Sequence, residues 1–99
     1  MVSERTILHY AKVECMRLGL RFFRNAPRQG VEAGWPDVIV LGPSEGRVLW
    51  METKAPGKPL RAIQNYRRHE IQSRGGHWCK PDSKSQVTEE LILFKGACK

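Results

Sequence analysis

The sequence predicts an α/β domain in which helices flank a mixed four-stranded sheet, and three features of the chain support this fold class. Apolar residues recur at helical spacing near both ends and again in the segment 60–74, while short apolar segments lie between them. In order, these segments read α-β-β-β-α-β-α, which is typical of helices packed on a mixed sheet. A chain of 99 residues has room for one hydrophobic core, so we expect residues 1–99 to form one domain.

The first predicted helix spans residues 3–18. Ser3 can accept a hydrogen bond from the first turn, and Gly19 can adopt the left-handed backbone that ends a helix. On a helical wheel, Glu4 falls in the middle of the apolar arc and Glu14 falls toward its flank. We therefore expect Glu4 to point inward, where a carboxylate needs a partner.

Three strands are predicted after this helix. Residues 20–25 form the first, a loop rich in proline and glycine follows at 26–36, and residues 37–41 form a compact apolar strand. Residues 47–53 follow a short turn. This third strand should therefore pair with 37–41 as a hairpin.

The rest of the chain supplies two helices and one more strand. Prolines and a glycine at 55–59 break the third strand and lead into a helix at 60–74, which a glycine pair stops. Residues 77–80 are a short last strand, and residues 86–94 are a closing helix. The complete order implies a mixed sheet with helices packed on it.

The charge of the chain points to a polyanionic partner. The chain has 17 Lys and Arg residues against 10 Asp and Glu, a formal charge of +7, and the basic residues are spread along its whole length. Such a surface releases counterions from phosphates when it binds them, so nucleic acid is the expected partner and the binding should be salt-sensitive. The alternative is a basic surface that serves solubility alone.

The cysteines and the overall hydropathy favour a cytoplasmic protein. Cys15, Cys79 and Cys98 match neither a disulfide framework nor a metal-binding pair, so we expect reduced thiols without a chemical role. No segment resembles a signal peptide or reaches the ~20 apolar residues needed to cross a membrane. We expect neither a membrane partner nor a small organic cofactor, and the short form is compatible with a phage protein acting in the host cytosol.

The residues that suggest chemistry lie on the predicted hairpin. Side chains alternate along a strand, so Glu52 and Lys54 project to the same side, about 7 Å apart. Asp37 opens the preceding strand, and hairpin pairing can bring its carboxylate beside that of Glu52. Two carboxylates, together with a backbone carbonyl between Glu52 and Lys54, form an oxygen-rich site suited to Mg²⁺ or Mn²⁺.

Such a site suits the hydrolysis of a phosphodiester bond. The reaction needs negative charge on the phosphate to be neutralised and a water to become nucleophilic near pH 7, and a divalent ion supports both. Lys54 would either orient or deprotonate the attacking water, or neutralise developing charge. The sequence leaves these roles of Lys54 open.

At this point the sequence resembles a known family. Gly34-Trp35-Pro36-Asp37, followed after fourteen residues by Glu52-Thr53-Lys54, resembles the PD-(D/E)XK nuclease motif and, more narrowly, its VRR-NUC branch. Glu4 on the first helix and Gln64 on the helix after the motif fit the same branch. The resemblance extends from about Ser3 to Thr88.

The resemblance implies a restriction-endonuclease-like fold and a set of site residues. Asp37 and Glu52 would bind the metal ion with the carbonyl of Thr53, and Glu4 would contribute to the same site. Lys54 would be catalytic, and Glu4 and Gln64 would complete the pocket. The implied activity is a divalent-metal-dependent deoxyribonuclease that leaves a 5′-phosphate, acting as a homodimer on branched DNA such as four-way junctions.

Several basic and aromatic residues are candidates for contacts with DNA. The arginines that flank the predicted pocket in sequence are expected to hold the phosphate backbone. They are Arg24, Arg28, Arg61, Arg67 and Arg68. Trp35 either stacks on a base or packs under its loop, whereas Trp50, inside a strand, is expected in the core.

Three other functions remain open from the sequence. The first is a nicking or flap endonuclease without a preference for junctions. The second is a non-catalytic DNA-binding protein with a nuclease fold, although paired carboxylates would repel the phosphate backbone unless a metal ion lies between them. The third is an RNA-associated basic protein, which would bind without metal and would not cleave.

Overall fold

The computed structural model describes residues 2–26, 32–44 and 46–98. The helices are α1 (Glu4–Leu18), α2 (Ala62–Ser73) and α3 (Lys84–Ala97). The strands are β1 (Arg21–Arg24), β2 (Val38–Leu41), β3 (Val48–Met51) and β4 (His77–Cys79). The predicted order of elements is confirmed, and the largest difference is that α3 extends further at both ends than the sequence suggested.

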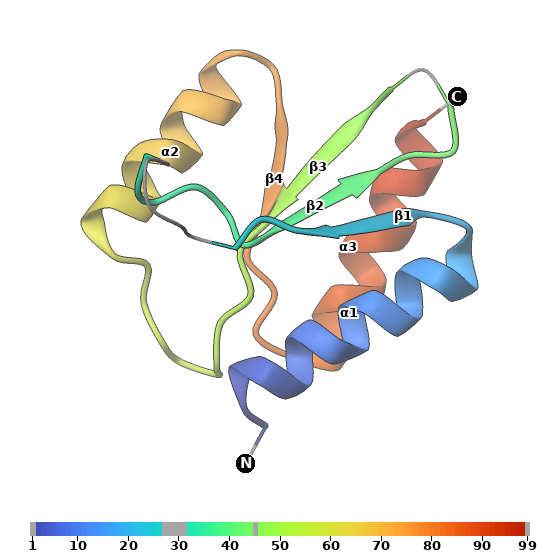
Figure 1. Cartoon of the computed structure of the whole chain (residues 1–99), viewed down its shortest axis with the longest axis horizontal. Coiled ribbons are helices and arrows are strands. Elements are labelled where there is room, and N and C mark those ends of the chain that lie inside the picture. Colours follow the sequence, from blue (N-terminus) through green and yellow to red (C-terminus); the bar gives the residue numbers. More distant parts are fainter. Residues whose placement is uncertain (1, 27–31, 45, 99) are drawn as a thin grey trace.

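The four strands form one sheet in the order β1-β2-β3-β4 (Figure 1). β1 pairs with β2 and β2 with β3 in antiparallel fashion, whereas β3 and β4 are parallel. The predicted hairpin and the mixed character of the sheet are therefore confirmed. Because α2 connects the two parallel strands, it carries the chain from one end of the sheet back to the other.

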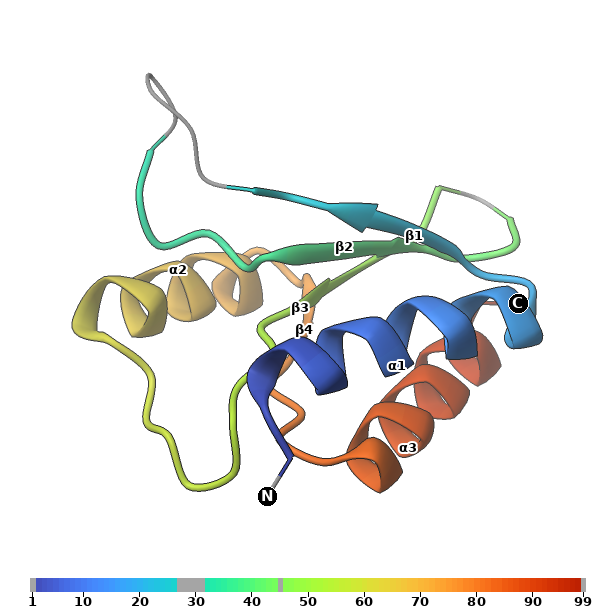
Figure 2. The same cartoon turned by 60° about the horizontal axis from the view of Figure 1, so that its bottom comes forward.

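The hydrophobic core lies between the sheet and the pair α1 and α3, which cover the same side of the sheet (Figure 2). Alternate residues of the central strands face this layer, namely Val38 and Val40 in β2 and Leu49 and Met51 in β3, all of them buried. The residues between them, including Trp50, therefore face the opposite side of the sheet.

α1 keeps the predicted ends but turns a different carboxylate inward. Ser3 accepts from the Thr6 N–H, and Gly19 has the left-handed φ of 73° that the sequence suggested. Glu14 is buried, with 5% of its surface exposed, whereas Glu4 is exposed. The expectation of an inward Glu4 is therefore wrong. A wheel gives only the angle around the axis, and Glu4 lies in the first turn, beyond the end of the core.

The buried carboxylate of Glu14 connects α1 to α3. It accepts hydrogen bonds from Arg17 Nε at 2.6 Å and Nη2 at 3.0 Å, and from Thr88 Oγ1 at 2.7 Å. Because the single hydroxyl proton of Thr88 goes to Glu14, the Tyr10 hydroxyl, 2.9 Å away, must donate to Thr88. The hydrogen bonds from Arg17 and Thr88 lower the pKa of Glu14 to about 2.

α2 packs on the other side of the sheet through aromatic and arginine contacts. Trp50 is half-buried there, with its ring centroid 5.5 Å from that of Trp35. The guanidinium of Arg67 lies 4.8 Å from the centre of the Trp35 ring, and that of Arg68 lies 5.3 Å from the centre of the Trp78 ring. The expectation that Trp50 belongs to the core is wrong, because its place in the pleat directs it away from α1 and α3.

Within the part of the chain that the structure describes, no helix has the length and apolar character needed to cross a membrane.

Cys15 and Cys79 are buried, and no disulfide joins the three free cysteines. Burial raises the pKa of Cys15 to about 12 and raises the pKa of Cys79 further. Buried neutral thiols of this kind do not act as nucleophiles.

Candidate active site

The site forms where the central strands end. In the β2–β3 register Val38 is opposite Met51, so the next step outward places Asp37 opposite Glu52. The extended pairing continues past β3, because the Glu52 N–H donates to the Cys79 carbonyl at 2.9 Å and the Lys54 N–H to the Pro81 carbonyl at 3.3 Å. Alternation therefore persists, and Glu52 and Lys54 share one face as predicted.

Two hydrogen bonds from Thr53 hold the Asp37 carboxylate in place. The Thr53 N–H donates to Asp37 Oδ1 at 3.0 Å, and the Thr53 hydroxyl donates to Oδ2 at 2.7 Å. Thr53 itself is completely buried. The middle residue of the Glu-Thr-Lys triplet thus anchors the acidic residue of the neighbouring strand, and each carboxylate oxygen of Asp37 keeps a lone pair for another ligand.

Glu52 and Lys54 are buried charged residues, with 5% and 6% of their surface exposed. Burial raises the pKa of Glu52 to about 8, the carboxylates of Asp37 and Glu4 raise it as well, and Lys54 and Arg61 act in the opposite direction. Three carboxylates thus lie close enough to oppose ionisation of the most buried one. A cation bound among them would relieve this repulsion.

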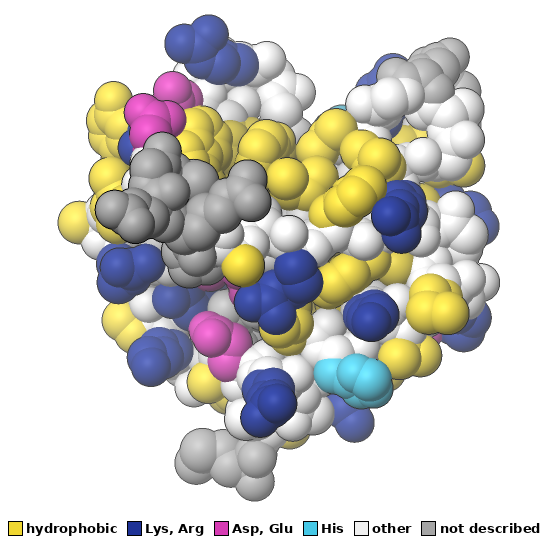
Figure 3. Space-filling view, in the orientation of Figure 1, with side chains coloured by type: hydrophobic (Ala, Val, Ile, Leu, Met, Phe, Trp, Pro, Cys, Tyr) yellow, Lys and Arg dark blue, Asp and Glu magenta, His cyan; other side chains and the backbone are white. Residues whose placement is uncertain are grey.

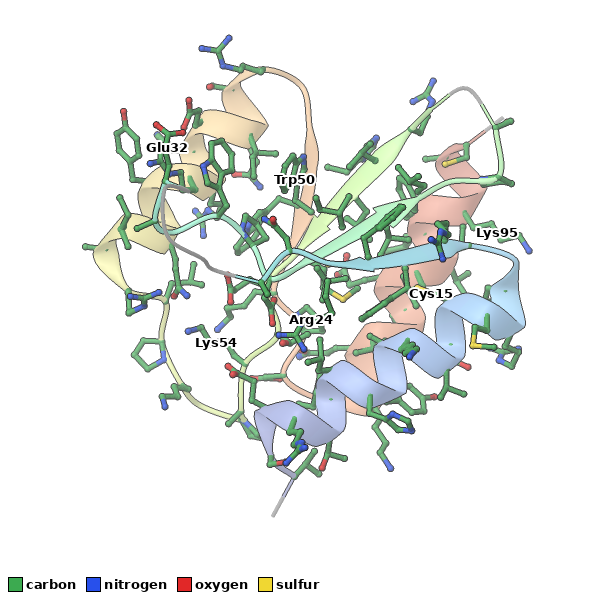
Figure 4. All side chains as sticks on the ribbon, in the orientation of Figure 1. Cys15, Arg24, Glu32, Trp50, Lys54 and Lys95 are labelled. Atoms are coloured by element: carbon green, nitrogen blue, oxygen red, sulfur yellow. The ribbon has the colours of Figure 1, made fainter. Side chains whose placement is uncertain are left out.

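Five of the site residues implied by the resemblance border one cleft of about 660 Å³, and Thr53 is buried behind it. Glu4, Asp37, Glu52, Lys54 and Gln64 all line it. Figure 4 shows Lys54 and Arg24 between the start of α1 and α2, where the strands end. Four segments that are separate in the sequence contribute to this one opening: the first turn of α1, the ends of β2 and β3, and the start of α2.

The two site residues on helices, Glu4 and Gln64, differ in burial. Glu4 is the first residue of α1 and lies exposed at the cleft. Gln64 is buried, and its Oε1 accepts a hydrogen bond from the Arg61 N–H at 2.9 Å, which caps the start of α2. This bond fixes the side-chain amide of Gln64, so its nitrogen remains as a fixed donor group beside the cleft.

The predicted DNA-binding arginines separate into two groups. Arg24 and Arg61 are exposed and line the cleft, whereas Arg67 and Arg68 belong to α2 and are half-buried. Arg67 donates to the Ala33 carbonyl at 2.9 Å and to Glu70 at 3.0 Å, so its guanidinium ties the loop before Asp37 to α2. Arg28 lies outside the described residues.

Lys58 and Asn25 also line the cleft, and the sequence reasoning missed both. Lys58 follows Gly57 in the turn between Lys54 and α2, where Gly57 has a positive φ of 77°. Asn25 extends the β1–β2 pairing, because its N–H donates to the Asp37 carbonyl at 2.8 Å and its side chain to the Pro36 carbonyl at 3.0 Å. The register of β1 against Asp37 is the one signal that could have found Asn25.

The donor set suits a small divalent cation. Among the residues that the structure describes, no three His, Cys, Asp or Glu side chains are grouped as a metal site. A metal ion here would thus rely on Asp37 and Glu52 together with a backbone carbonyl, water or substrate oxygens. Mg²⁺ is commonly held in this way, by one or two carboxylates with several waters. The raised pKa of Glu52 also favours a bound cation, because a positive charge would stabilise the ionised carboxylate.

The fold has a known counterpart. A solved structure described as "VRR_NUC domain" superposes on the chain with a TM-score of 0.77 and 24% sequence identity, over 94% of this chain and 97% of its own. No family model and no curated protein matches the sequence. The chain therefore has the fold of a VRR-NUC domain, a small α/β unit with a four-stranded mixed sheet, as the sequence resemblance implied.

Proposed function

We propose that the chain is a divalent-metal-dependent DNA endonuclease whose active site comprises Asp37, Glu52 and Lys54. The observation that carries the proposal is their convergence at the end of the sheet, in one open cleft with basic residues around it. In Figure 3, acidic surface below the centre of this face lies next to Lys and Arg side chains. Nuclease activity is also what the VRR-NUC fold suggests.

Each group of the cleft has a role in this proposal. Asp37 and Glu52, with the Thr53 carbonyl, would hold Mg²⁺ or Mn²⁺, and Glu4 would complete the metal site from the edge of the cleft. The ion when bound neutralises phosphate charge and lowers the pKa of water. Lys54 lies on the same face as Glu52 and would orient or deprotonate the attacking water, or offset charge on the phosphate. Gln64 would fix the position of a water or phosphate oxygen through its amide nitrogen.

The basic residues of the cleft would position the DNA. Arg24, Lys58 and Arg61 are exposed and line it, so they are placed to hold phosphates on either side of the scissile bond. Because these contacts are electrostatic, affinity should fall steeply with salt. DNA as substrate, the free thiols and the basic composition agree with the cytoplasmic location that the sequence predicts.

A purely DNA-binding role fits the site less well. Glu52 is buried beside a second carboxylate, and its raised pKa shows that ionising it there costs free energy. A surface that only binds phosphate gains nothing from acidic groups at the bottom of its cleft, because they repel the backbone. The carboxylates are useful there only if a cation lies between them and the phosphate.

For the assembly we propose a homodimer that cuts branched DNA such as four-way junctions. Two copies related by a two-fold axis would present two clefts to a two-fold symmetric junction. The helix layer offers exposed apolar side chains that a second copy would cover, among them Met16 with 72% and Leu93 with 68% of their surface exposed. A nicking or flap endonuclease without junction preference is the alternative.

The test is cleavage of end-labelled duplex, flap and four-way-junction DNA by wild type and by Asp37→Ala, each with Mg²⁺, Mn²⁺ or EDTA. We expect metal-dependent cutting by the wild type, a preference for the junction, and no cutting by the variant. Equal cutting of all three substrates would remove the junction preference and leave the nuclease. Binding without cutting under every condition would contradict the catalytic proposal.

A further inference from the structure

A row of aromatic and aliphatic side chains crosses the side of the sheet that α1 and α3 do not cover. Phe23 in β1 is opposite Ile39 in β2, Ile39 is opposite Trp50 in β3, and Trp50 is aligned with Trp78 in β4. Paired residues of adjacent strands project to the same face, so these four side chains lie next to one another. We call them the aromatic row.

Part of this row remains accessible, most of all at Phe23. Phe23 has 40% of its surface exposed, and the other three side chains are half-buried. Beside Trp50 a largely apolar groove of about 220 Å³ opens under α2, lined in part by Trp35, Ile71 and Arg74. Figure 3 shows hydrophobic side chains across the middle of this face with Lys and Arg side chains around them. In the described residues no helix covers the row over β1 and β2 (Figure 2).

An arginine stacks at each end of the row. The guanidinium of Arg21 lies 4.4 Å from the centre of the Phe23 ring, and that of Arg68 lies 5.3 Å from the centre of the Trp78 ring. The Nε of Arg68 is buried and finds no hydrogen-bond partner among the residues that the structure describes. Glu70, the acidic residue of the groove, is already paired with Arg67. The row thus carries a positive charge at each end.

The row continues directly into the active site. Asp37 is two residues before Ile39, and Glu52 is two residues after Trp50, so the carboxylates project from the same face about 7 Å further along their strands. Trp35 borders both the apolar groove and the catalytic cleft. A DNA strand whose phosphate lies in the cleft would therefore place its adjacent nucleotides over the row.

We propose that the aromatic row is a stacking platform for unpaired nucleotides of the substrate strand. Stacking of bases on aromatic rings between cationic groups is how single-stranded nucleic acid is held without sequence preference. A duplex has its bases stacked internally and cannot use such a platform. The inference rests on the proposed nuclease function and concerns its substrate. A platform for unpaired nucleotides favours the flap substrate, named above as the alternative, over a fully paired four-way junction.

The charge of the row argues for this occupant over a second copy of the chain. Two copies that met through this face would bring Arg21 and Arg68 of one copy near the same arginines of the other. Like charges placed together at an interface cost binding free energy. Phosphates of a nucleic acid strand instead complement both arginines.

The test measures binding apart from cleavage. Affinities of the full chain for a fluorescent twelve-nucleotide oligothymidylate and for a blunt hairpin duplex are measured in EDTA. Phe23→Ala and Phe23→Leu remove the ring, and Phe23→Tyr keeps it. Tyr66→Leu is the matched control, because it removes an exposed ring on α2 that lies outside the row. Circular dichroism checks that each variant is folded, and sedimentation gives its oligomeric state.

We expect both ring-removing variants to bind oligothymidylate at least about fivefold more weakly, as the loss of one stacked base implies. Phe23→Tyr and Tyr66→Leu should bind as the wild type does, and duplex affinity should change less than twofold. Arg21→Gln should weaken oligothymidylate binding more than Lys95→Gln, the charge-matched control on α3.

Other results would overturn the platform. They are unchanged oligothymidylate binding by both ring-removing variants, an equal loss for oligothymidylate and duplex, or a dimer that Phe23→Ala converts to monomer. If duplex DNA is cut with Mn²⁺ while oligothymidylate binding is insensitive to the ring, the platform fails and the nuclease stands. Ring-dependent binding with no cleavage of any DNA would contradict the nuclease proposal alone.

Discussion

Replacing Thr53 by valine tests whether the middle residue of the Glu-Thr-Lys triplet anchors the site. The Thr53 hydroxyl donates to Asp37 Oδ2 at 2.7 Å, and the side chain is completely buried. Valine has nearly the same shape, so the change leaves no cavity. It removes one hydrogen bond to a carboxylate, a contribution of about 1.5–3 kcal/mol. For a domain of this size, a loss of about 2 kcal/mol lowers Tm by about 8–16 °C.

Thr53→Ser separates the hydrogen bond from the packing. Serine keeps the hydroxyl and loses one buried methyl group, which costs about 1 kcal/mol. Thermal unfolding in EDTA, followed by circular dichroism, should therefore rank wild type above Thr53→Ser and Thr53→Ser above Thr53→Val. If Thr53→Val is as stable as the wild type and Thr53→Ser is the less stable variant, packing dominates and the anchoring argument is refuted.

Three further predictions concern charge. Glu14 has a lowered pKa of about 2, so its stabilising contribution is complete above pH 4.5 and is lost as pH falls toward 2. The Tm of the wild type should therefore drop more across that range than the Tm of Glu14→Gln. Glu89→Gln, the control, should behave as the wild type does. Glu52 has a raised pKa of about 8, so the metal-free protein should lose stability as pH rises from about 4.5 to 8, a slope absent in Glu52→Gln and checked by thermal unfolding in EDTA. Lys54→Ala should slow DNA cleavage by at least about 100-fold in a single-turnover assay while salt-dependent DNA binding in EDTA changes little; cleavage at the wild-type rate would exclude a catalytic role.

The sequence predicted the elements well because their signals are local. Caps such as Ser3 and Gly19 and the breaks at prolines and glycines depend on neighbouring residues alone, and the structure has helix and strand ends close to them. The short turn predicted the hairpin, and the register that the structure gives to this hairpin puts Asp37 opposite Glu52. Strand alternation then placed Lys54 on the face of Glu52.

The features that the sequence predicted wrongly or missed depend on contacts between segments that are far apart in the chain. Glu14 is buried against α3, where the hydroxyl of Thr88 donates a hydrogen bond to it. Because Thr88 is far from Glu14 in the sequence, no pattern within α1 predicts this contact. Trp50 is apolar and inside a strand, yet only the packing of α1 and α3 decides which face of the sheet is the core. Lys58 borders the cleft because of the path of the turn before α2.

The most direct test of the central claim is Mn²⁺ binding at the acidic cleft, followed by the decrease of the free-ion electron paramagnetic resonance signal as protein is added. The wild type should bind Mn²⁺ at pH 8, and Asp37→Asn and Glu52→Gln should each weaken binding strongly, whereas Glu89→Gln, a carboxylate on the surface of α3, should bind as the wild type does. Mn²⁺ binding that is absent in the wild type, or unchanged in both site variants when they are folded, would contradict the assignment of this cleft as a metal-dependent active site.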